Sequence, residues 1–202
     1  MRKRILFCSS LVFSVLFFSS CNKDNADSKV NEDILGNYKL VSLTARTEVT
    51  QTMSDGSSTA KTVSKSNYTT INNQGTLKIE PAQMISTDMS YSVNTIGTAD
   101  IYEDGVYIDT YDVPFQAVVP SSSATAGYKW ITKDSIYFES GSMFYAGSST
   151  PLATSADGAR VRLEGDKLYI SGNKVQNTQS NQSGYIVNQE AKVQMLVTFQ
   201  KQ

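Results

Sequence analysis

The sequence contains no histidine, and its 202 residues include only two cysteines, Cys8 and Cys21. Histidine is the usual general base near neutral pH and the commonest zinc ligand, so its absence excludes triad hydrolases and ordinary zinc enzymes. Everything after Cys21 lacks a thiol nucleophile and a disulfide. The composition therefore predicts that the protein is not an enzyme and carries no cofactor and no metal.

Paired carboxylates could act as acid and base without histidine, but the spacing of the acidic residues does not support such a site. Residues such as Glu80, Asp88, Asp100, Glu139 and Glu164 are scattered, one to each predicted strand or turn. This distribution is typical of solvated carboxylates.

Clusters of basic residues are also missing after Arg2, Lys3 and Arg4, and without these three the net charge changes from −1 to −4. A protein that binds phosphate backbones concentrates Lys and Arg on one face. We therefore expect no nucleic-acid partner.

The N-terminus has the order of a secretory signal peptide. An uncharged apolar run of 14 residues, from Ile5 to Phe18, follows the three basic residues and leads to Ser19 and Ser20. A membrane-spanning helix needs about 20 apolar residues, so this run is too short for a permanent span. Residues 1–20 are therefore predicted to be a signal peptide.

The segment Phe18-Ser19-Ser20-Cys21 resembles the lipobox of bacterial lipoproteins, although Phe18 replaces the leucine that the family prefers. The resemblance implies that the Cys21 thiol carries a diacylglyceryl group and that the signal peptidase cuts just before it. The membrane is then a partner through the N-terminal lipid. Residues 21–33 are polar and are expected to form a flexible tether.

Residues 22–27, Asn-Lys-Asp-Asn-Ala-Asp, resemble the lysine-plus-acid signal that sends Bacteroidetes lipoproteins to the outer face of the outer membrane. A soluble tether without a signal explains them equally well. We expect a protein of the cell envelope that is anchored in the outer membrane. The sequence does not decide between the periplasmic face and the cell surface.

We expect residues 34–202 to form one domain, in which short segments rich in Tyr, Val, Ile and Thr alternate with turn residues. This pattern predicts an all-β fold, an antiparallel meander barrel of about eight strands, with a β-sandwich as the alternative. The expected strands are 37–49, 61–71, 76–79, 83–93, 107–119, 128–139, 159–163, 167–171 and a C-terminal strand. Loops are expected at 52–60, 120–127, 146–158 and 173–183.

Two turns fix the register of predicted hairpins. Asp104-Gly105 favours a two-residue turn that pairs Tyr102 with Tyr107 and Ile101 with Ile108. Gly165-Asp166 likewise sets Glu164 opposite Lys167 and Leu163 opposite Leu168. In the C-terminal strand, apolar residues alternate with mostly polar ones from Ala191 to Gln200, which predicts one buried face.

The opening strand, Leu35-Gly36-Asn37-Tyr38-Lys39-Leu40-Val41-Ser42, resembles the start of lipocalin-like (calycin-type) lipoprotein domains of Bacteroidetes. The hairpin from Leu163 to Ile170 and the ending Val197-Thr198-Phe199 are similar to that family too. Tyr38 stands where the family usually has tryptophan. The resemblance implies a small barrel with an apolar interior, which in true lipocalins receives a hydrophobic small molecule.

Three residues are candidates for specific roles. Trp130 and Phe144 stand beside predicted loops and could bind a ligand, with core packing as the alternative. Ser135, in Asp134-Ser135-Ile136, resembles the O-glycosylation acceptor of Bacteroidetes, with an Asp-Ser turn as the alternative.

The sequence thus favours a lipid-anchored envelope lipoprotein that acts as a non-enzymatic binding module for an apolar or amphipathic small molecule or a glycan. The alternative is an accessory structural lipoprotein that docks to another, unidentified protein through its loops.

Overall fold

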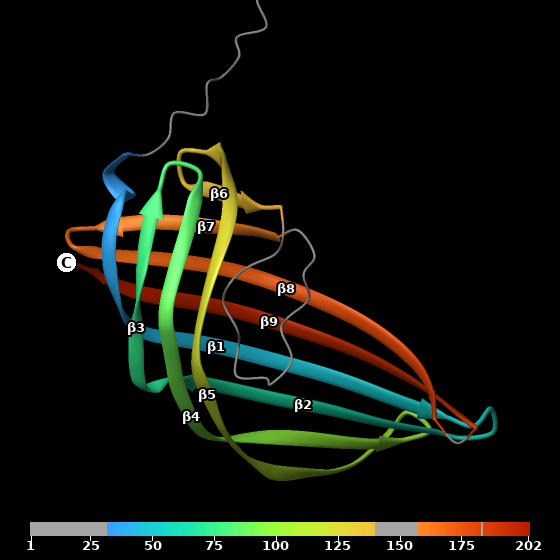
Figure 1. Cartoon of the computed structure of the whole chain (residues 1–202). Helices are drawn as coiled ribbons and strands as arrows, with labels where there is room; N and C mark the ends of the chain where they lie inside the picture. The colour runs from blue at the N-terminus through green and yellow to red at the C-terminus, as the bar shows by residue number, and fades with distance from the viewer. Residues whose placement is uncertain (1–31, 140–156, 183) are drawn as a thin grey trace, which may run out of the picture.

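The computed structural model describes residues 32–139, 157–182 and 184–202, and it confirms the all-β class. A short 3-10 helix, η1 (Glu32–Ile34), leads into one antiparallel sheet of nine strands (Figure 1). The strands are β1 (Gly36–Ser54), β2 (Thr59–Thr69), β3 (Ile71–Glu80), β4 (Gln83–Glu103), β5 (Val106–Thr132), β6 (Ser135–Phe138), β7 (Asp157–Glu164), β8 (Lys167–Gln182) and β9 (Tyr185–Lys201).

Hydrogen bonds between the first and last strands close the sheet into a ring. β1 and β9 pair from Tyr38 and Lys201 at one end to Ser54 and Ile186 at the other. The ring runs β1-β3-β4-β5-β6-β7-β8-β9 and back to β1, so it contains the eight strands expected of a meander barrel. A sandwich would need two sheets packed face to face. The barrel-like meander is therefore confirmed over the alternative.

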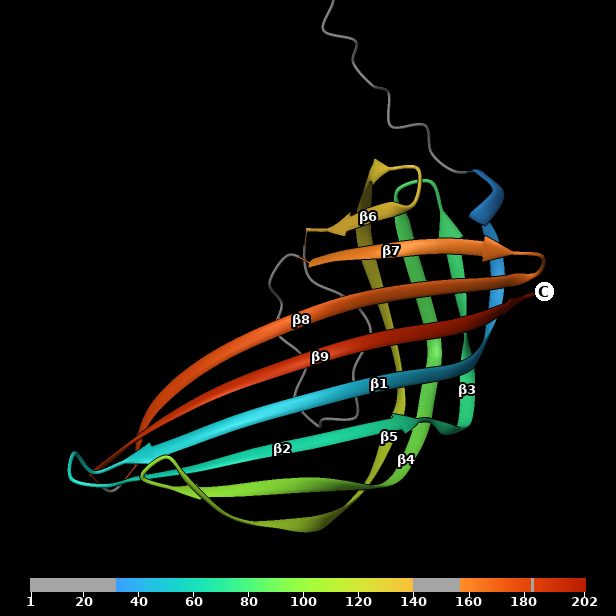
Figure 2. The same ribbon diagram turned by 180° about the vertical axis from the view of Figure 1, so that it is seen from behind.

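The ninth strand, β2, divides the structure into two parts. β3 lies between residues 36–39 of β1 and 83–92 of β4, whereas β2 lies between residues 44–54 of β1 and 98–103 of β4. Around β3 the ring is closed. Beyond it the described strands continue as a sheet in the order β8-β9-β1-β2-β4-β5, and Figures 1 and 2 show this extension projecting to one side. We call it the distal sheet (residues 44–54, 59–69, 93–103, 106–119, 172–182 and 185–196).

A buried threonine lies where β1 changes its partner from β3 to β2. The Thr70 amide donates to the Leu43 carbonyl at 2.8 Å, and the Thr70 hydroxyl accepts the Leu43 amide at 2.9 Å. The same hydroxyl donates to Asn73 Oδ1 at 2.6 Å. Thr70 is only 4% exposed, so these bonds satisfy polar groups that water does not reach. The side chain thereby replaces a backbone partner at the junction of the two strands.

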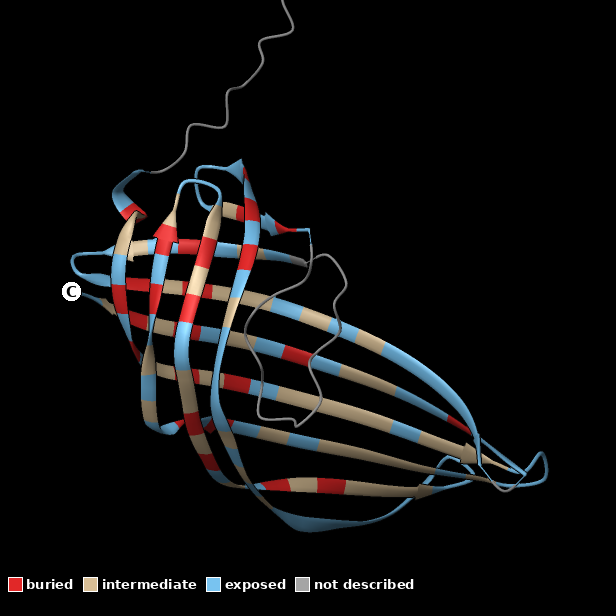
Figure 3. Cartoon of the chain, viewed as in Figure 1, coloured by how far each residue is buried: buried red, intermediate tan, exposed pale blue. Residues whose placement is uncertain are grey.

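Buried side chains gather in the closed part, as Figure 3 shows by colour. The largest fully buried ones include Tyr38, Phe138, Phe199, Ile34, Leu77, Met84, Ile136, Leu168, Ile170 and Val197. Tyr38 can be buried because its hydroxyl donates to the Ile34 carbonyl at 2.8 Å, and burial raises the pKa of this phenol. The η1 turn is in this way fixed against the closed end of the barrel.

Both predicted turns form, but one of the predicted registers is wrong. Asp104 and Gly105 have φ of 47° and 82°, and Tyr102 pairs with Tyr107 as expected. Ile101, however, pairs with Asp109 instead of Ile108, because a β-bulge inserts one residue into β5 at this point. The Gly165-Asp166 turn gives both expected pairs, Glu164 with Lys167 and Leu163 with Leu168.

Two predicted loops are strands. Residues 120–127 belong to β5 and residues 173–182 to β8, where each of the latter pairs with β9 in an unbroken register. The Ser, Asn and Gln side chains of these segments are typical of loops, and the segments lack apolar alternation. They are strands because their backbones hydrogen-bond to neighbouring strands. Of the predicted loop 52–60 only residues 55–58 connect strands, and residues 146–156 lie outside the described part.

The predicted strand boundaries are also corrected in two places. The single strand expected at 61–71 ends at Thr69, and β3 begins at Ile71. The strand expected at 128–139 is divided by a turn at Lys133 and Asp134 into the end of β5 and β6. The alternation in the C-terminal strand is confirmed, since Val193, Val197 and Phe199 are buried.

Replacement of Thr70 by valine keeps the shape of the side chain but leaves the buried Leu43 amide without its acceptor. We expect Thr70→Val to lower the free energy of unfolding by about 1–3 kcal/mol, the usual cost of an unsatisfied buried polar group. Thr69→Val is the matched control, because the Thr69 hydroxyl makes an exposed hydrogen bond to Thr44. Urea unfolding of both variants measures the difference, and equal midpoints would contradict the role given to Thr70.

Candidate binding surface

One small cavity lies inside the closed part of the barrel. The described residues enclose a cavity of about 50 Å³ there, lined by Leu40, Leu43, Met89, Tyr91 and Val197 among others. Small-molecule sites usually have volumes of about 300–1,000 Å³. This cavity is therefore too small to hold an apolar ligand of ordinary size.

The candidate residues from the sequence lie in different places. Trp130 is 7% exposed and packs edge-on against Tyr128, with 6.0 Å between ring centroids, and it does not line the small cavity. Its environment is that of a core residue. Phe144 and Cys21 lie outside the described residues, so their predicted roles stay predictions.

Ser135 begins β6 directly after the turn that separates it from β5. Its hydroxyl donates to Asp134 Oδ1 at 3.3 Å, and the Thr132 hydroxyl donates to the same oxygen at 2.6 Å. Both bonds lower the pKa of the Asp134 carboxyl, and the bond from Thr132 has the larger effect. The Asp-Ser turn is thus present, and glycosylation of Ser135 stays a prediction.

A row of polar and aromatic side chains crosses the outer face of the distal sheet. The register places one residue of each strand in line, in the order Gln179, Asn188, Thr52, Lys61, Tyr102 and Tyr107. We call these six residues the polar row. Directly paired residues share a face of a sheet, and neighbouring strands are about 4.8 Å apart, so the row is about 24 Å long.

The polar row faces away from the barrel interior. Along β9 the buried residues Val187 and Val193 point inward. Asn188 follows Val187 directly, so its side chain points to the opposite, outer face. Along β2 the buried Tyr68 points inward. Lys61 lies an odd number of residues away, so its side chain points to the outer face. Every member of the row is therefore open to a ligand that approaches the sheet from outside.

One end of the polar row is a groove of about 440 Å³ on β1, β8 and β9. It is lined only by hydroxyl, amide and carboxylate side chains: Thr50, Thr52, Asn177, Thr178, Gln179, Asn188, Gln189 and Glu190. Gln179 Nε2 donates to Asn188 Oδ1 at 2.9 Å, which orients both amides. The remaining amide groups of this pair can donate to and accept from a ligand.

The other end of the polar row is aromatic. The rings of Tyr102 and Tyr107 lie edge to face with 5.7 Å between centroids, and the Lys61 ammonium stands 4.6 Å above the Tyr102 ring. Tyr107 is 52% exposed. An exposed ring that packs against a neighbouring ring offers a flat apolar surface beside polar groups.

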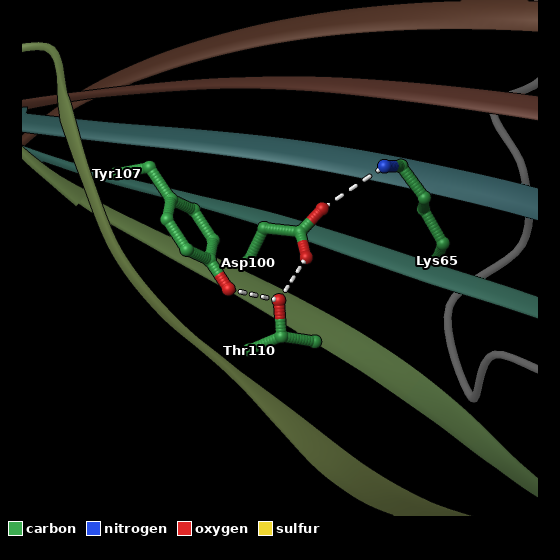
Figure 4. A network of polar contacts seen from close by, with 4 residues as sticks. All are labelled: Lys65, Asp100, Tyr107 and Thr110. Carbon is green, nitrogen blue, oxygen red and sulfur yellow. Dashed lines mark hydrogen bonds and ion pairs between the residues drawn. The ribbon is translucent and has the colours of Figure 1, made fainter.

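Two groups of charged residues on the same face form ion pairs. Lys65 Nζ lies 3.0 Å from Asp100, whose other oxygen accepts from the Thr110 hydroxyl at 2.7 Å; Tyr107 and Thr110 share a hydrogen bond of 2.9 Å (Figure 4). On β9, Lys192 lies 2.6 Å from Glu190 and 3.9 Å from Glu48 of β1. Within these two groups the opposite charges largely cancel.

The hydrogen bonds around Asp100 also change how it titrates. The Thr110 hydroxyl, and after it Lys65, lower the pKa of the Asp100 carboxyl, and Asp100 in turn raises the pKa of Lys65. The network therefore keeps its ionised form over a wide range of pH. Tyr107 is connected to this ion pair by its hydrogen bond with the Thr110 hydroxyl.

Nothing in the described ranges has the arrangement of a metal centre: no three acidic residues there converge on one point. The helical part of the described chain contains no segment long and apolar enough to cross a membrane. The polar row was not predicted from the sequence, because Asn177, Gln179 and their neighbours were assigned to a loop. Its members also come from six strands, and only the complete register brings them into line.

The titration of Asp100 gives a direct test of the network. Thr110→Val removes the first of the bonds to the Asp100 carboxylate, so we expect the pKa of Asp100 to rise toward the ordinary value of about 3.9. A lowered carboxyl pKa stabilises the fold above the unfolded-state pKa, and this contribution is lost as the pH falls through the folded-state pKa. In Thr110→Val this contribution is therefore smaller, and its loss is complete at a higher pH.

The measurement is an NMR titration of the Asp100 carboxyl carbon, with acid unfolding followed in parallel. Thr98→Val, on the same face of β4, is the control and should leave the pKa of Asp100 unchanged. An Asp100 pKa that does not move in Thr110→Val would show that the hydrogen bond is not formed in solution.

Comparisons with known proteins gave no match, whether with protein-family models, with curated proteins or with solved structures. What the distal sheet does is therefore argued from its own residues. Its outer face combines an amide-lined groove, an exposed aromatic end and paired charges, all within one row of cross-strand neighbours.

Proposed function

We propose that this protein is a lipid-anchored lipoprotein of the cell envelope that acts as a non-enzymatic binding module for a glycan. The polar row is the observation that carries the proposal: it aligns amide, hydroxyl and aromatic side chains on one exposed face. Capture of an apolar small molecule has less support, because the cavity beside Leu40 and Leu43 measures only about 50 Å³.

The chemistry of the polar row suits a sugar chain. Sugars carry many hydroxyl groups, which act as donors and acceptors, and the amides of Gln179 and Asn188 offer both functions in return. Sugar rings also have apolar faces of C–H groups, which can stack on an exposed ring such as Tyr107. The paired charges around Asp100 and Lys192 favour an uncharged ligand over an acidic or basic one.

The accessory role, docking to another protein, is supported by a different surface. Ile71, Ile96 and Val118 are 50%, 67% and 78% exposed on the outside of β3, β4 and β5. A groove of about 220 Å³ lies beside Ile71 and Val118. Exposed apolar groups of this kind occur at protein interfaces, but they also occur singly on ordinary surfaces.

The position of η1 fits an anchor that leaves the polar row accessible. Figure 1 shows η1 at the closed end of the barrel, whereas the tips of the β1–β2, β4–β5 and β8–β9 hairpins lie at the far end of the distal sheet. From Cys21 to Glu32 an extended chain spans at most about 40 Å. A lipid on Cys21 would thus hold the closed end near the membrane.

Replacement of Cys21 tests the anchor. Cys21→Ser should abolish the incorporation of labelled fatty acid, because the hydroxyl cannot replace the thiol in lipid attachment, and should move the protein from the membrane to the soluble fraction. Stable anchoring needs at least two acyl chains, so partial lipidation would give only weak retention. Cys8→Ser is the control; if it has the same effect, or if Cys21→Ser stays membrane-bound, Cys21 is not the anchor.

Binding of arrayed neutral oligosaccharides tests the ligand class. We expect the wild-type protein to bind at least one of them, and Tyr107→Ala or Asn188→Ala to weaken that binding by roughly tenfold, the effect of losing a stacking contact or a pair of hydrogen bonds. Isothermal titration with the strongest oligosaccharide gives the affinities.

Tyr111→Ala is the matched control. Tyr111 lies on the same strand as Tyr107 and is 55% exposed, but it pairs with Ala99 on the opposite face of the sheet. It should bind like the wild type. If no oligosaccharide binds, or if Tyr111→Ala weakens binding as much as Tyr107→Ala, the polar row is not a glycan site.

A further inference from the structure

The polar row has two exposed ends and a less exposed middle. Gln179 and Asn188 are exposed at one end and Tyr107 at the other, whereas Lys61 and Tyr102 between them are half-buried. Gln179 on β8 and Tyr107 on β5 are separated by five strand spacings, which amounts to about 24 Å along the sheet. A ligand that uses both ends must therefore be an extended one.

The groove at the β8 and β9 end offers both donors and acceptors. Gln179 Nε2 donates to Asn188 Oδ1, so Gln179 Oε1 is still able to accept and Asn188 Nδ2 to donate. This combination matches a pair of neighbouring sugar hydroxyls, each of which can donate one hydrogen bond and accept another. The groove, at about 440 Å³, has the size of an ordinary small-molecule site, so it can hold one part of a ligand that spans the row.

The ring of Tyr107, at the other end, is held in place before any ligand binds. Its edge-to-face contact with Tyr102 has 5.7 Å between centroids, and its hydroxyl shares a 2.9 Å hydrogen bond with Thr110. The Thr110 hydroxyl donates in turn to Asp100 Oδ1 at 2.7 Å (Figure 4). A side chain that is already fixed loses less conformational entropy on binding, so a single sugar ring stacked on Tyr107 can stabilise a complex.

Along β9 and β5 the chemistry of each end is not continued. On the outer face of β9, Ile186 precedes Asn188 and is 49% exposed, and Glu190 follows it and is ion-paired. Tyr107 lies next to the turn that joins β4 to β5, so the strand ends close beyond it. Across the strands, in contrast, the register connects the two ends through Thr52, Lys61 and Tyr102.

Two carboxylates lie in the next row of paired residues, on the side of the closed part. The register places Glu190 and Asp100 three strand spacings apart in this row, which is about 14 Å. Glu190 is ion-paired with Lys192 and Asp100 with Lys65. A carboxylate accepts hydrogen bonds from neutral hydroxyls but repels an acidic group. Acceptors beside both ends of the row therefore favour a neutral chain over an acidic one.

We propose that the ligand of the polar row is an extended chain of neutral sugars that lies across the strands, with one part in the groove of β8 and β9 and another part stacked on Tyr107. The inference rests on the glycan-binding function proposed above and adds the direction, the length and the charge of the bound chain. Contact at one end raises the effective concentration of the chain at the other end. The affinity therefore increases with chain length until the chain spans the row, and then levels off.

Isothermal titration with oligosaccharides of graded length tests the proposal. The probes are the neutral malto-, cello- and manno-oligosaccharide series, from disaccharide to octasaccharide, and the same lengths of the strongest arrayed glycan. For at least one series we expect the dissociation constant to fall by roughly tenfold or more once the chain reaches about 24 Å, and to change little beyond that length. Equal affinity at every length contradicts the extended site and leaves glycan binding intact. If nothing binds at any length, the proposed function fails as well.

Variants at the two ends distinguish binding at both ends from binding at one. Tyr107→Ala and Asn188→Ala should each raise the dissociation constant of the octasaccharide by roughly tenfold, whereas the disaccharide reaches only one end and should respond to only one of them. Asn94→Ala is the matched control, because Asn94 is an exposed amide on the same face of β4, eight residues before Tyr102. It should bind like the wild type. An octasaccharide that Asn188→Ala weakens and Tyr107→Ala does not is bound at one end only, which overturns the proposal.

Asn181→Ala tests the alternative direction of the chain. Asn181 is an exposed amide that follows Gln179 on the same face of β8, so a chain that runs along β8 would contact it. A chain that crosses the strands gains little from it, and we expect Asn181→Ala to bind the octasaccharide like the wild type. A loss as large as that in Asn188→Ala, with none in Tyr107→Ala, would show that the chain follows β8. Circular dichroism checks that the variants are folded.

Discussion

The structure depends on the pairing of β1, which has to serve two different parts of the molecule. On one side β1 pairs with β9 from residue 38 to residue 54, and this contact turns a meander into a ring. On its other side it pairs first with β3 and then with β2. Thr70 makes this exchange possible, because its hydroxyl accepts the Leu43 amide at the gap between the two partners. Without that bond the ring would have an unsatisfied backbone group next to its core.

The two parts are stabilised by different forces. The closed part contains most of the fully buried side chains, and burial of each contributes roughly 1.5–3 kcal/mol. The distal sheet has fewer buried residues, such as Tyr68, Val93 and Val193, and relies more on backbone ladders and exposed ion pairs. Exposed ion pairs add little stability each. Local opening is therefore expected to begin in the distal sheet, which is also the part that carries the candidate binding surface.

The sequence predicts the parts of the fold that depend on local rules. Asp104-Gly105 and Gly165-Asp166 specify their turns through backbone preferences, and the C-terminal strand reveals its buried face by simple alternation. It does not reveal β8 beyond residue 171. There the side chains on both faces are mostly polar, so no hydrophobic period distinguishes the strand from a loop, and the pairing with β9 decides the conformation. The bulge at Ile108 is hidden for a similar reason, since a one-residue insertion changes no composition.

The polar row could not be predicted at all, and the reason is geometric. Gln179 and Asn188 are nine residues apart, but Thr52 and Tyr107 are far from both in the chain, and the row exists only once five pairs of strands are in register. Its location follows from the same division that Thr70 creates. A barrel closed along its whole length would have a convex outer surface, whereas the distal sheet has an outer face wide enough for six aligned side chains. The exchange of partners along β1 thus produces the proposed binding face.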